Sequence, residues 1–346
     1  MVPSALDLPD DPLVSQIDRC HDRGWTDGLP VIPPTPARVD GMLGPLAARR
    51  HEVVAVLPPA QGEATLETVA ANAVMAGCLP AHLPVVLAAV RALSRPRAAL
   101  DEVATSVHAM APVVIVDGPV VEQLGFNAST GVLGAGNRSN AAVGRAVQLC
   151  IRNIGGAHPG ALDAATHGHP GKYSFLVAAQ PGPWTPLGER LGFPPGTSTV
   201  TVKAADAPLC IADIGHDDPE TILDTLAASV AIPGSYNAFF REELWLVMGP
   251  EHSARLDAAG WTPPTIATAL HHRATIPAGR LRETGIYGFI DDALRPSWLD
   301  DADDATPISI VDHPNRVHII VAGGPAGGYT AALLGQGVST TEVVRW

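Results

Sequence analysis

The chain has 346 residues, of which 46% are hydrophobic and only 16% are charged. This length suits two domains or one large α/β unit, and the apolar content is sufficient for a large core. The formal net charge of −13 argues against nucleic acid and anionic membrane surfaces as partners, because an acidic protein repels phosphate groups.

Several patterns argue against export or membrane insertion. The N-terminal sequence MVPSALDLPDDPLVSQ has neither the basic start nor the apolar run of a signal peptide. The longest apolar stretch falls short of the roughly 20 residues that a membrane span needs. No pair of cysteines has CxxC spacing, which argues against a zinc knuckle or a disulfide scaffold. We therefore expect a cytoplasmic protein with free thiols.

The N-terminal part of the chain predicts helices on either side of a rigid extended segment. A short helix is expected over residues 12–24. Pro33, Pro34 and Pro36 preclude a helix over residues 27–36, so this segment is expected to be an extended strap across another domain or chain. Further helices are expected over residues 36–46, 63–77 and 83–93.

From residue 111 onward, four segments share one plan: an apolar β run, a Gly or Pro turn, and an amphipathic stretch. They span residues 112–126, 173–193, 244–261 and 318–336. The predicted fold class is α/β, with a sheet built from strand–Gly-rich turn–helix units, and internal repetition remains open. We expect an N-terminal strap and helical region at 1–105 and an α/β domain with the ligand site at 106–346.

Between these units, further strands are expected over residues 196–212 and helices over residues 219–230 and 262–271.

The densest polar cluster is NASTGVLGAGNRSN, residues 127–140, which leads into a helix. Glycine amides and a helix N-terminus favour an anion, and an arginine can bind a carboxylate bidentately. The alternative is a long loop capped by Ser139 or Asn140. The candidate substrate-binding residues are Ser129, Thr130, Gly134, Gly136, Asn137, Arg138 and Asn140. The segment is neither a Walker loop nor GxGxxG directly after a strand, so no dinucleotide is expected.

A second cluster is THGHPGKY, residues 166–173. His169 is a candidate general acid or base and Lys172 a candidate charge clamp. Alternatively, His167 and His169 hold a divalent metal, with Asp163 as a third ligand, or the segment is a turn with solvent-facing histidines. His108, just before a strand, is a further catalytic candidate or a core histidine.

A third cluster is the Gly-rich turn after HIIVA, over residues 322–330. Strand, turn and an apparent helix follow in the order suited to anion binding, which makes Gly323, Gly324 and Tyr329 candidate ligand contacts. We expect this turn and the 131–140 loop to face one common cavity.

The stretches DGLPVIPPTPARVDGML, NAVMAGCLP, GNRSNAAVGRA and GHPGKYSF resemble a bacterial family associated with UGSC-type (seleno)proteins. The resemblance covers most of the chain and implies no particular reaction. It implies that Asn137, Arg138, His169 and Lys172 share one site.

These patterns together predict an enzyme that acts on a small carboxylate- or carbonyl-bearing anion by lyase or hydrolase chemistry. In this hypothesis Arg138 binds the anion, His169 moves a proton and Lys172 stabilises developing charge. The alternative is a non-catalytic or half-site subunit of a two-component enzyme. A homo-oligomer or a second protein subunit is expected in either case.

Overall fold

The computed structural model describes residues 13–290 and 295–345 of the chain. Residues 1–12 lie outside the described part of the chain. They include most of the N-terminal stretch from which we expect that there is no signal peptide. The mixed α/β fold class is confirmed. Within the described residues, no helix has the length and apolar character needed to cross a membrane.

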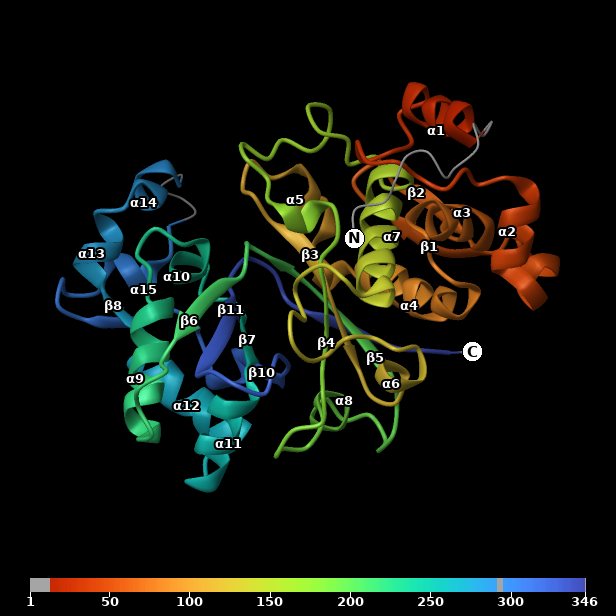
Figure 1. Ribbon diagram of the computed structural model, residues 1–346. Helices are drawn as coiled ribbons and strands as arrows, with labels where there is room; N and C mark the ends of the chain where they lie inside the picture. The colour runs from red at the N-terminus through yellow and green to blue at the C-terminus, as the bar shows by residue number, and fades with distance from the viewer. Residues whose placement is uncertain (1–12, 291–294, 346) are drawn as a thin grey trace, which may run out of the picture.

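A four-stranded mixed sheet organises the first half of the molecule (Figure 1). Its central strand β3 (Ala111–Asp117) pairs in parallel with β4 (Leu176–Ala178) and antiparallel with β5 (Thr199–Ala205). The edge strand β12 (Thr340–Val343) comes from the C-terminal end of the chain and pairs antiparallel with β5.

Three helices cover the outer face of this sheet. They are α3 (Leu66–Ala76), α4 (Leu83–Leu93) and α7 (Arg138–Asn153). Alternate strand residues such as Val114 and Val202 pack with these helices in one buried cluster. The predicted helix over residues 83–93 is confirmed residue for residue, because a continuous run of alanine, valine and leucine buries it on nearly every side.

A second four-stranded sheet organises the other half. Its strand β7 (Leu244–Met248) pairs in parallel with β10 (Val317–Val321) and antiparallel with β11 (Tyr329–Leu333), and β6 (Leu209–Ala212) pairs with β11 at the edge. Three helices pack on its outer face in a second buried cluster. They are α9 (Pro219–Val230), α11 (Pro250–Ala258) and α12 (Pro263–Arg273).

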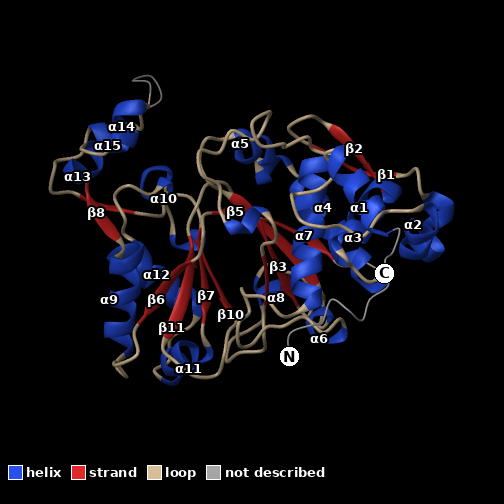
Figure 2. Ribbon diagram, turned by 45° about the horizontal axis from the view of Figure 1, so that its top comes forward, coloured by secondary structure: helices blue, strands red, loops and turns tan. Residues whose placement is uncertain are grey.

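The two sheets face each other and form the centre of the molecule. Val113 and Ile115 of β3 pack with Trp245 and Val247 of β7 in a third buried cluster. Figure 2 shows the strands of both sheets between helices on either side, which gives a helix–sheet–sheet–helix sandwich. This arrangement follows from strands that are apolar on both faces, since each face must be covered.

Both sheets have the same pairing pattern with their edge strands exchanged. β6 follows β5 along the chain but pairs in the second sheet, whereas β12 follows β11 and pairs in the first. The four-segment repeat considered from the sequence is not confirmed. In its fourth segment the Gly-rich turn leads into strand β11, so the predicted helix after residue 328 is wrong.

The N-terminal region is part of the first half. The predicted extended segment over residues 27–36 is confirmed for residues 27–35, whereas Pro36 begins α2 (Pro36–Leu43). The strap, residues 25–35, follows α1 (Leu13–Asp22) and packs within the same half of the molecule, where Ile32 N donates to Met75 O of α3 at 3.2 Å. A hairpin follows, of β1 (Val53–Leu57) and β2 (Gly62–Thr65).

The hydrophobic core crosses the expected domain boundary between residues 105 and 106. Leu100 of α5 (Leu100–Thr105) and Val114 of β3 belong to one buried cluster. The remaining elements connect or flank the two sheets. They are α6 (Val120–Gln123), α8 (Leu187–Arg190), α10 (Tyr236–Phe240), β8 (Thr275–Pro277), α13 (Ala278–Arg282), α14 (Gly285–Phe289), α15 (Ser297–Asp300) and β9 (Pro307–Ser309).

Candidate functional site

A cavity of about 490 Å³ lies in the first half, at the end of the sheet where β3 begins. Its apolar wall comes from α5, the start of β3 and the second half of α7, with Leu100, Met110 and Ile151 as examples. Its polar wall comes mainly from the segment 157–173, which Figure 1 shows passing beside α5. A cavity with one apolar and one polar wall is the usual form of a small-molecule site.

Arg152 is the most informative residue of the polar wall. It lies in the last turn of α7 and lines the cavity. Its Nε atom is buried and has no hydrogen-bond partner among the described residues. The negative end of the helix dipole favours a cation at this position, but it supplies no acceptor for the buried Nε–H. The Arg152 side chain as a whole lines the cavity and makes no hydrogen bond or ion pair with the described residues, so its guanidinium suits an external anion.

Lys172 and Asp163 form an ion pair on the same wall. Lys172 Nζ donates to both carboxylate oxygens of Asp163, at 2.7 and 2.6 Å. The Asp163 side chain is only 11% exposed, so this ion pair is largely shielded from solvent. Lys172 therefore contributes a partly neutralised positive charge to the cavity.

His169 is neutral and has both ring nitrogens engaged. Nδ1 accepts from Gly171 N at 3.1 Å, so the ring proton is on Nε2, which donates to Ala205 O at 3.1 Å. Burial is the main cause that lowers the pKa of His169 below its ordinary value. The ring thus has no free nitrogen for the proton transfer that the sequence led us to expect.

His167, two residues earlier, is different. It is exposed, lines the cavity, and its ring makes no hydrogen bond or ion pair within the described chain. No group of three or more His, Cys, Asp or Glu side chains able to hold a metal ion occurs among the described residues. The expected metal pair of His167 and His169 therefore has no assembled ligand set, and Asp163 is engaged by Lys172.

His108 lies behind this wall and does not line the cavity. Its Nε2 is 2.8 Å from Oδ1 of Asp206, the residue after β5, and its ring lies against that of Tyr236, with 4.0 Å between centroids and a tilt of 35°. His108 and His169 are close enough to influence each other electrostatically. The three catalytic candidates, His108, His169 and Lys172, are therefore in one region of the fold.

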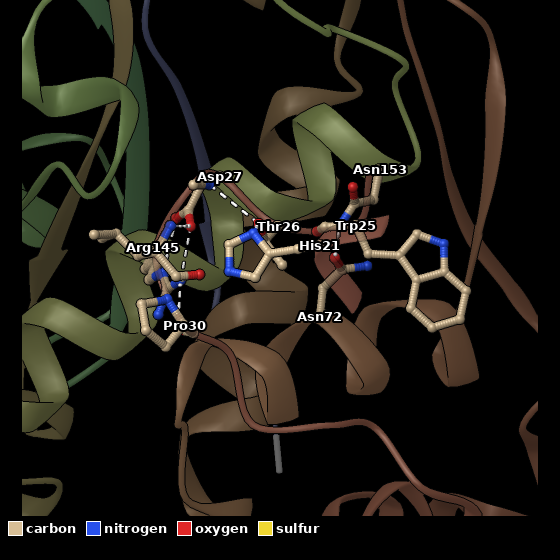
Figure 3. Close-up of polar contacts among 10 residues, drawn as sticks. His21, Trp25, Thr26, Asp27, Pro30, Asn72, Arg145 and Asn153 are labelled. Atoms are coloured by element: carbon tan, nitrogen blue, oxygen red, sulfur yellow. Dashed lines mark hydrogen bonds and ion pairs between the residues drawn. The ribbon is translucent and has the colours of Figure 1, made fainter. Parts of the chain in front are cut away.

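The N-terminal strap forms another part of the cavity rim through Asp27. Arg145 of α7 donates Nε and Nη2 to the two oxygens of Asp27 at 2.8 and 2.7 Å, and Nη2 also donates to Pro30 O (Figure 3). Burial alone raises the pKa of Asp27, but the hydrogen bonds and charge of Arg145 outweigh it and hold that pKa below its usual range.

A second polar contact holds the strap about two turns further along α7. Asn153 Nδ2 donates to Trp25 O at 2.9 Å and to Asn72 Oδ1 of α3 at 2.8 Å (Figure 3). These contacts run along the same face as the Asp27–Arg145 pair. Hydrogen bonds from two residues of α7, Arg145 and Asn153, therefore hold the strap on this helix.

The asparagine side chains of the loop over residues 127–140 form hydrogen bonds within the loop. Asn137 caps α7 by accepting from Asn140 N at 3.0 Å, and Asn140 bonds both the N–H and the C=O of Asn127. Gly134 N donates to Gly131 O at 2.7 Å. The polar side chains that indicated a ligand site are thus used to fold the loop, and the capping residue is Asn137 rather than Ser139 or Asn140.

Arg138 is also engaged within the protein. Its Nε donates to the carbonyl of Gly77, the residue that ends α3, at 2.9 Å. Asn137 and Arg138 are at the start of α7, whereas Arg152 at its other end lines the cavity with His169 and Lys172. The four residues that the family resemblance implies in one site do not share one cavity.

The Gly-rich turn of residues 322–328 meets the 127–130 segment, as Gly323 N donates to Ala128 O at 2.9 Å and Gly324 lies against Thr130. Its cradle already holds a carboxylate of the chain: Gly327 N donates to Glu251 Oε2 at 2.6 Å. Ser129 and Gly323 line a separate cavity of about 380 Å³ with Gln180. Tyr329, on β11, is not among its lining residues.

Sequence reasoning missed Arg152 and Asp206. A basic residue in the last turn of a helix is ordinary, and Asp206 stands in an Asp-Ala-Pro segment that is typical of a turn. Whether Arg152 lines a cavity and whether Asp206 contacts a histidine depends on segments that are far away in the sequence. No local signal marked either residue.

No family model matches the chain, and none of the curated proteins matches it. Among solved structures, the cyanuric acid hydrolase from A. caulinodans is similar at 11% identity over 67% of this chain and 68% of that chain, with a TM-score of 0.16. This likeness is too low to support a statement about fold or function.

Proposed function

We propose that the 490 Å³ cavity binds a small organic monoanion and that the protein is an enzyme acting on it by hydrolase or lyase chemistry. The observation that carries the proposal is the Arg152 side chain, which lines the cavity and makes no hydrogen bond or ion pair with any described residue. A carboxylate that accepts from its guanidinium would form a charge-assisted hydrogen bond, which contributes about 1.5–3 kcal/mol.

The charge balance of the cavity defines the substrate class. Asp27 is neutralised by Arg145, and Asp163 is neutralised by Lys172. Arg152 remains as the one formal cation without an ionic partner among the described arginine, lysine and acidic residues of the lining. This balance favours one negative charge on the ligand, and the wall of Leu100, Val103 and Met110 favours an apolar body.

We assign the reacting groups among the cavity residues according to whether their side chains are engaged by other parts of the protein. His167 is the proton-transfer group, because its ring is at the cavity and unengaged. Lys172 stabilises charge that develops on an oxygen of the substrate, and Asp163 holds it in place. His169 and Arg138, expected from the sequence in these roles, have structural partners instead.

The binding step is tested by titrating the protein with benzoate, a monoanion with an apolar body, by calorimetry. Losing a charge-assisted hydrogen bond of about 1.5–3 kcal/mol should weaken binding in Arg152→Met by about ten- to a hundredfold. The melting temperature should not fall, since the substitution removes a buried Nε donor that has no partner among the described residues. Arg316→Met, in the other half, is the control. Equal affinity in Arg152→Met and wild type would refute the site.

The chemical step is tested by screening small carboxylate esters, amides and hydroxy acids for turnover with the purified chain. The expected result is turnover that His167→Gln lowers by about 10²–10⁴ without loss of benzoate binding. Undiminished turnover in His167→Gln would contradict the assigned role. Binding without any turnover would favour the alternative of a half-site subunit.

A further inference from the structure

We propose that His108 and Asp206 form a clamp that positions the polar wall of the cavity, residues 166–173. The inference rests on the proposed function, because it explains how His167 and Lys172 are held for it. His108 touches neither the cavity nor a ligand, so it is a positioning residue and not a catalytic one.

The segment 166–173 is attached at two points, one in the connection between α5 and β3 and one at the end of β5. Thr166 N donates to Val107 O at 2.9 Å, and His169 Nε2 donates to Ala205 O at 3.1 Å. His167 stands between these two attachments, and Lys172 follows the second by three residues. The positions of both cavity groups therefore depend on where the carbonyls of residues 107 and 205 lie.

The clamp joins the residues that follow those two carbonyls in the chain. His108 Nε2 and Asp206 Oδ1 are 2.8 Å apart, and their side chains are only 17% and 27% exposed. Because each partner is adjacent to an attachment point, this contact, which is an ion pair when His108 is protonated, fixes the distance between them. The ring of Tyr236 of α10 lies against the His108 ring at a tilt of 35°, so the clamp also contacts the second half of the molecule.

The second half provides an internal comparison. His313 begins an equivalent turn before β10, and its Nδ1 accepts from Asn315 N at 3.1 Å. That ring is exposed and makes no other hydrogen bond within the described chain. A His-Pro turn therefore forms without a clamp, and the clamp is present only where the turn belongs to a cavity wall.

The test follows the Nε2 proton of His169 by NMR, which requires no ligand. His108→Gln and Asp206→Ala should each speed the exchange of this proton by about tenfold, as expected for a weakened hydrogen bond to Ala205. Asp206→Glu, which keeps the carboxylate, should restore slow exchange. His216→Gln removes a similar pair with Asp213 in the second half and is the matched control.

Benzoate affinity provides the second measurement. It should fall about three- to tenfold in His108→Gln and Asp206→Ala, recover in Asp206→Glu, and stay unchanged in His216→Gln. Unchanged exchange of the His169 proton in both clamp variants would overturn the proposal. If wild type fails to bind benzoate, the proposed function loses its support while the exchange measurement still decides the clamp.

Discussion

The two halves of the molecule contain the same local turn in different surroundings. His169-Pro170 precedes β4 and His313-Pro314 precedes β10, and in each the histidine ring accepts from the backbone two residues later. Only His169 is half-buried, bonded to a distant carbonyl and next to a cavity. The comparison shows that the His-Pro turn itself serves to begin a parallel strand. Any functional role of its histidine depends on the residues and the cavity around the turn.

The basic residue after each turn shows the same contrast. Lys172 binds Asp163 nine residues away and closes a loop over the cavity. Arg316 binds Asp312 four residues away, at 3.3 Å, on a more exposed surface. The first pair shapes a site, whereas the second is an ordinary surface ion pair.

The largest expected difference between the two turns is in how much their histidines contribute to the free energy of unfolding. His169→Ala removes two hydrogen bonds and an edge-to-face contact with Phe175, so it should lower the free energy of unfolding by about 2–4 kcal/mol. His313→Ala should cost less than about 1 kcal/mol. Urea denaturation measures both. Equal losses would show that the two turns are equivalent.

Acidification should remove part of the same stabilisation. Burial lowers the folded pKa of His169 below its unfolded value, so its contribution is full above the ordinary value of 6.5 and is lost as the pH falls through the lowered folded pKa. The difference in unfolding free energy between wild type and His169→Ala should therefore narrow between pH 7.5 and pH 5. A constant difference would mean that the ring is not held neutral.

Lys172→Met should weaken both binding and stability. Benzoate affinity should fall about tenfold, because the cavity loses a positive charge and Asp163 becomes an unpaired negative charge beside the ligand. The free energy of unfolding should fall by about 1–2 kcal/mol more in this variant than in Arg316→Met. Calorimetry and urea denaturation together measure both. A similar loss of affinity in Arg316→Met would point to a long-range charge effect rather than a site.

The fold was predictable where local chemistry decides it. The prolines of residues 33–36 determine the strap, and Asp218 caps α9 by accepting from Thr221 N, as its sequence indicates. Strand β11 was not predictable, because YTAALL after a Gly-rich turn fits a helix as well as a strand. Its pairing with β6 and β7, which are far away in sequence, decides the outcome.

The site was predictable only as a region. The polar density of residues 166–173 correctly singled out a cavity wall, but the division of roles between His167 and His169 depends on Ala205, a carbonyl from another strand. The Gly-rich loop at 127–140 was selected as a ligand site from its polar side chains, but in the structure its asparagine side chains bond within the loop. Its Asn side chains satisfy their own backbone, and sequence alone does not distinguish an amide that folds a loop from one that binds a ligand.

The smallest expected effect concerns the Gly-rich turn of the second half. Glu251 accepts from Gly327 N and pairs with Arg255 at 2.7 Å, so the cradle is filled from within the chain. Glu251→Gln keeps an acceptor oxygen but loses the charge, and should cost about 0.5–1 kcal/mol of stability. Benzoate affinity should stay at the wild-type value, because this turn does not line the 490 Å³ cavity. Urea denaturation and calorimetry on the same variant measure the two quantities. A fall in affinity comparable to that of Lys172→Met would mean that the turn takes part in anion binding, and the contrast between the halves would then have to be abandoned.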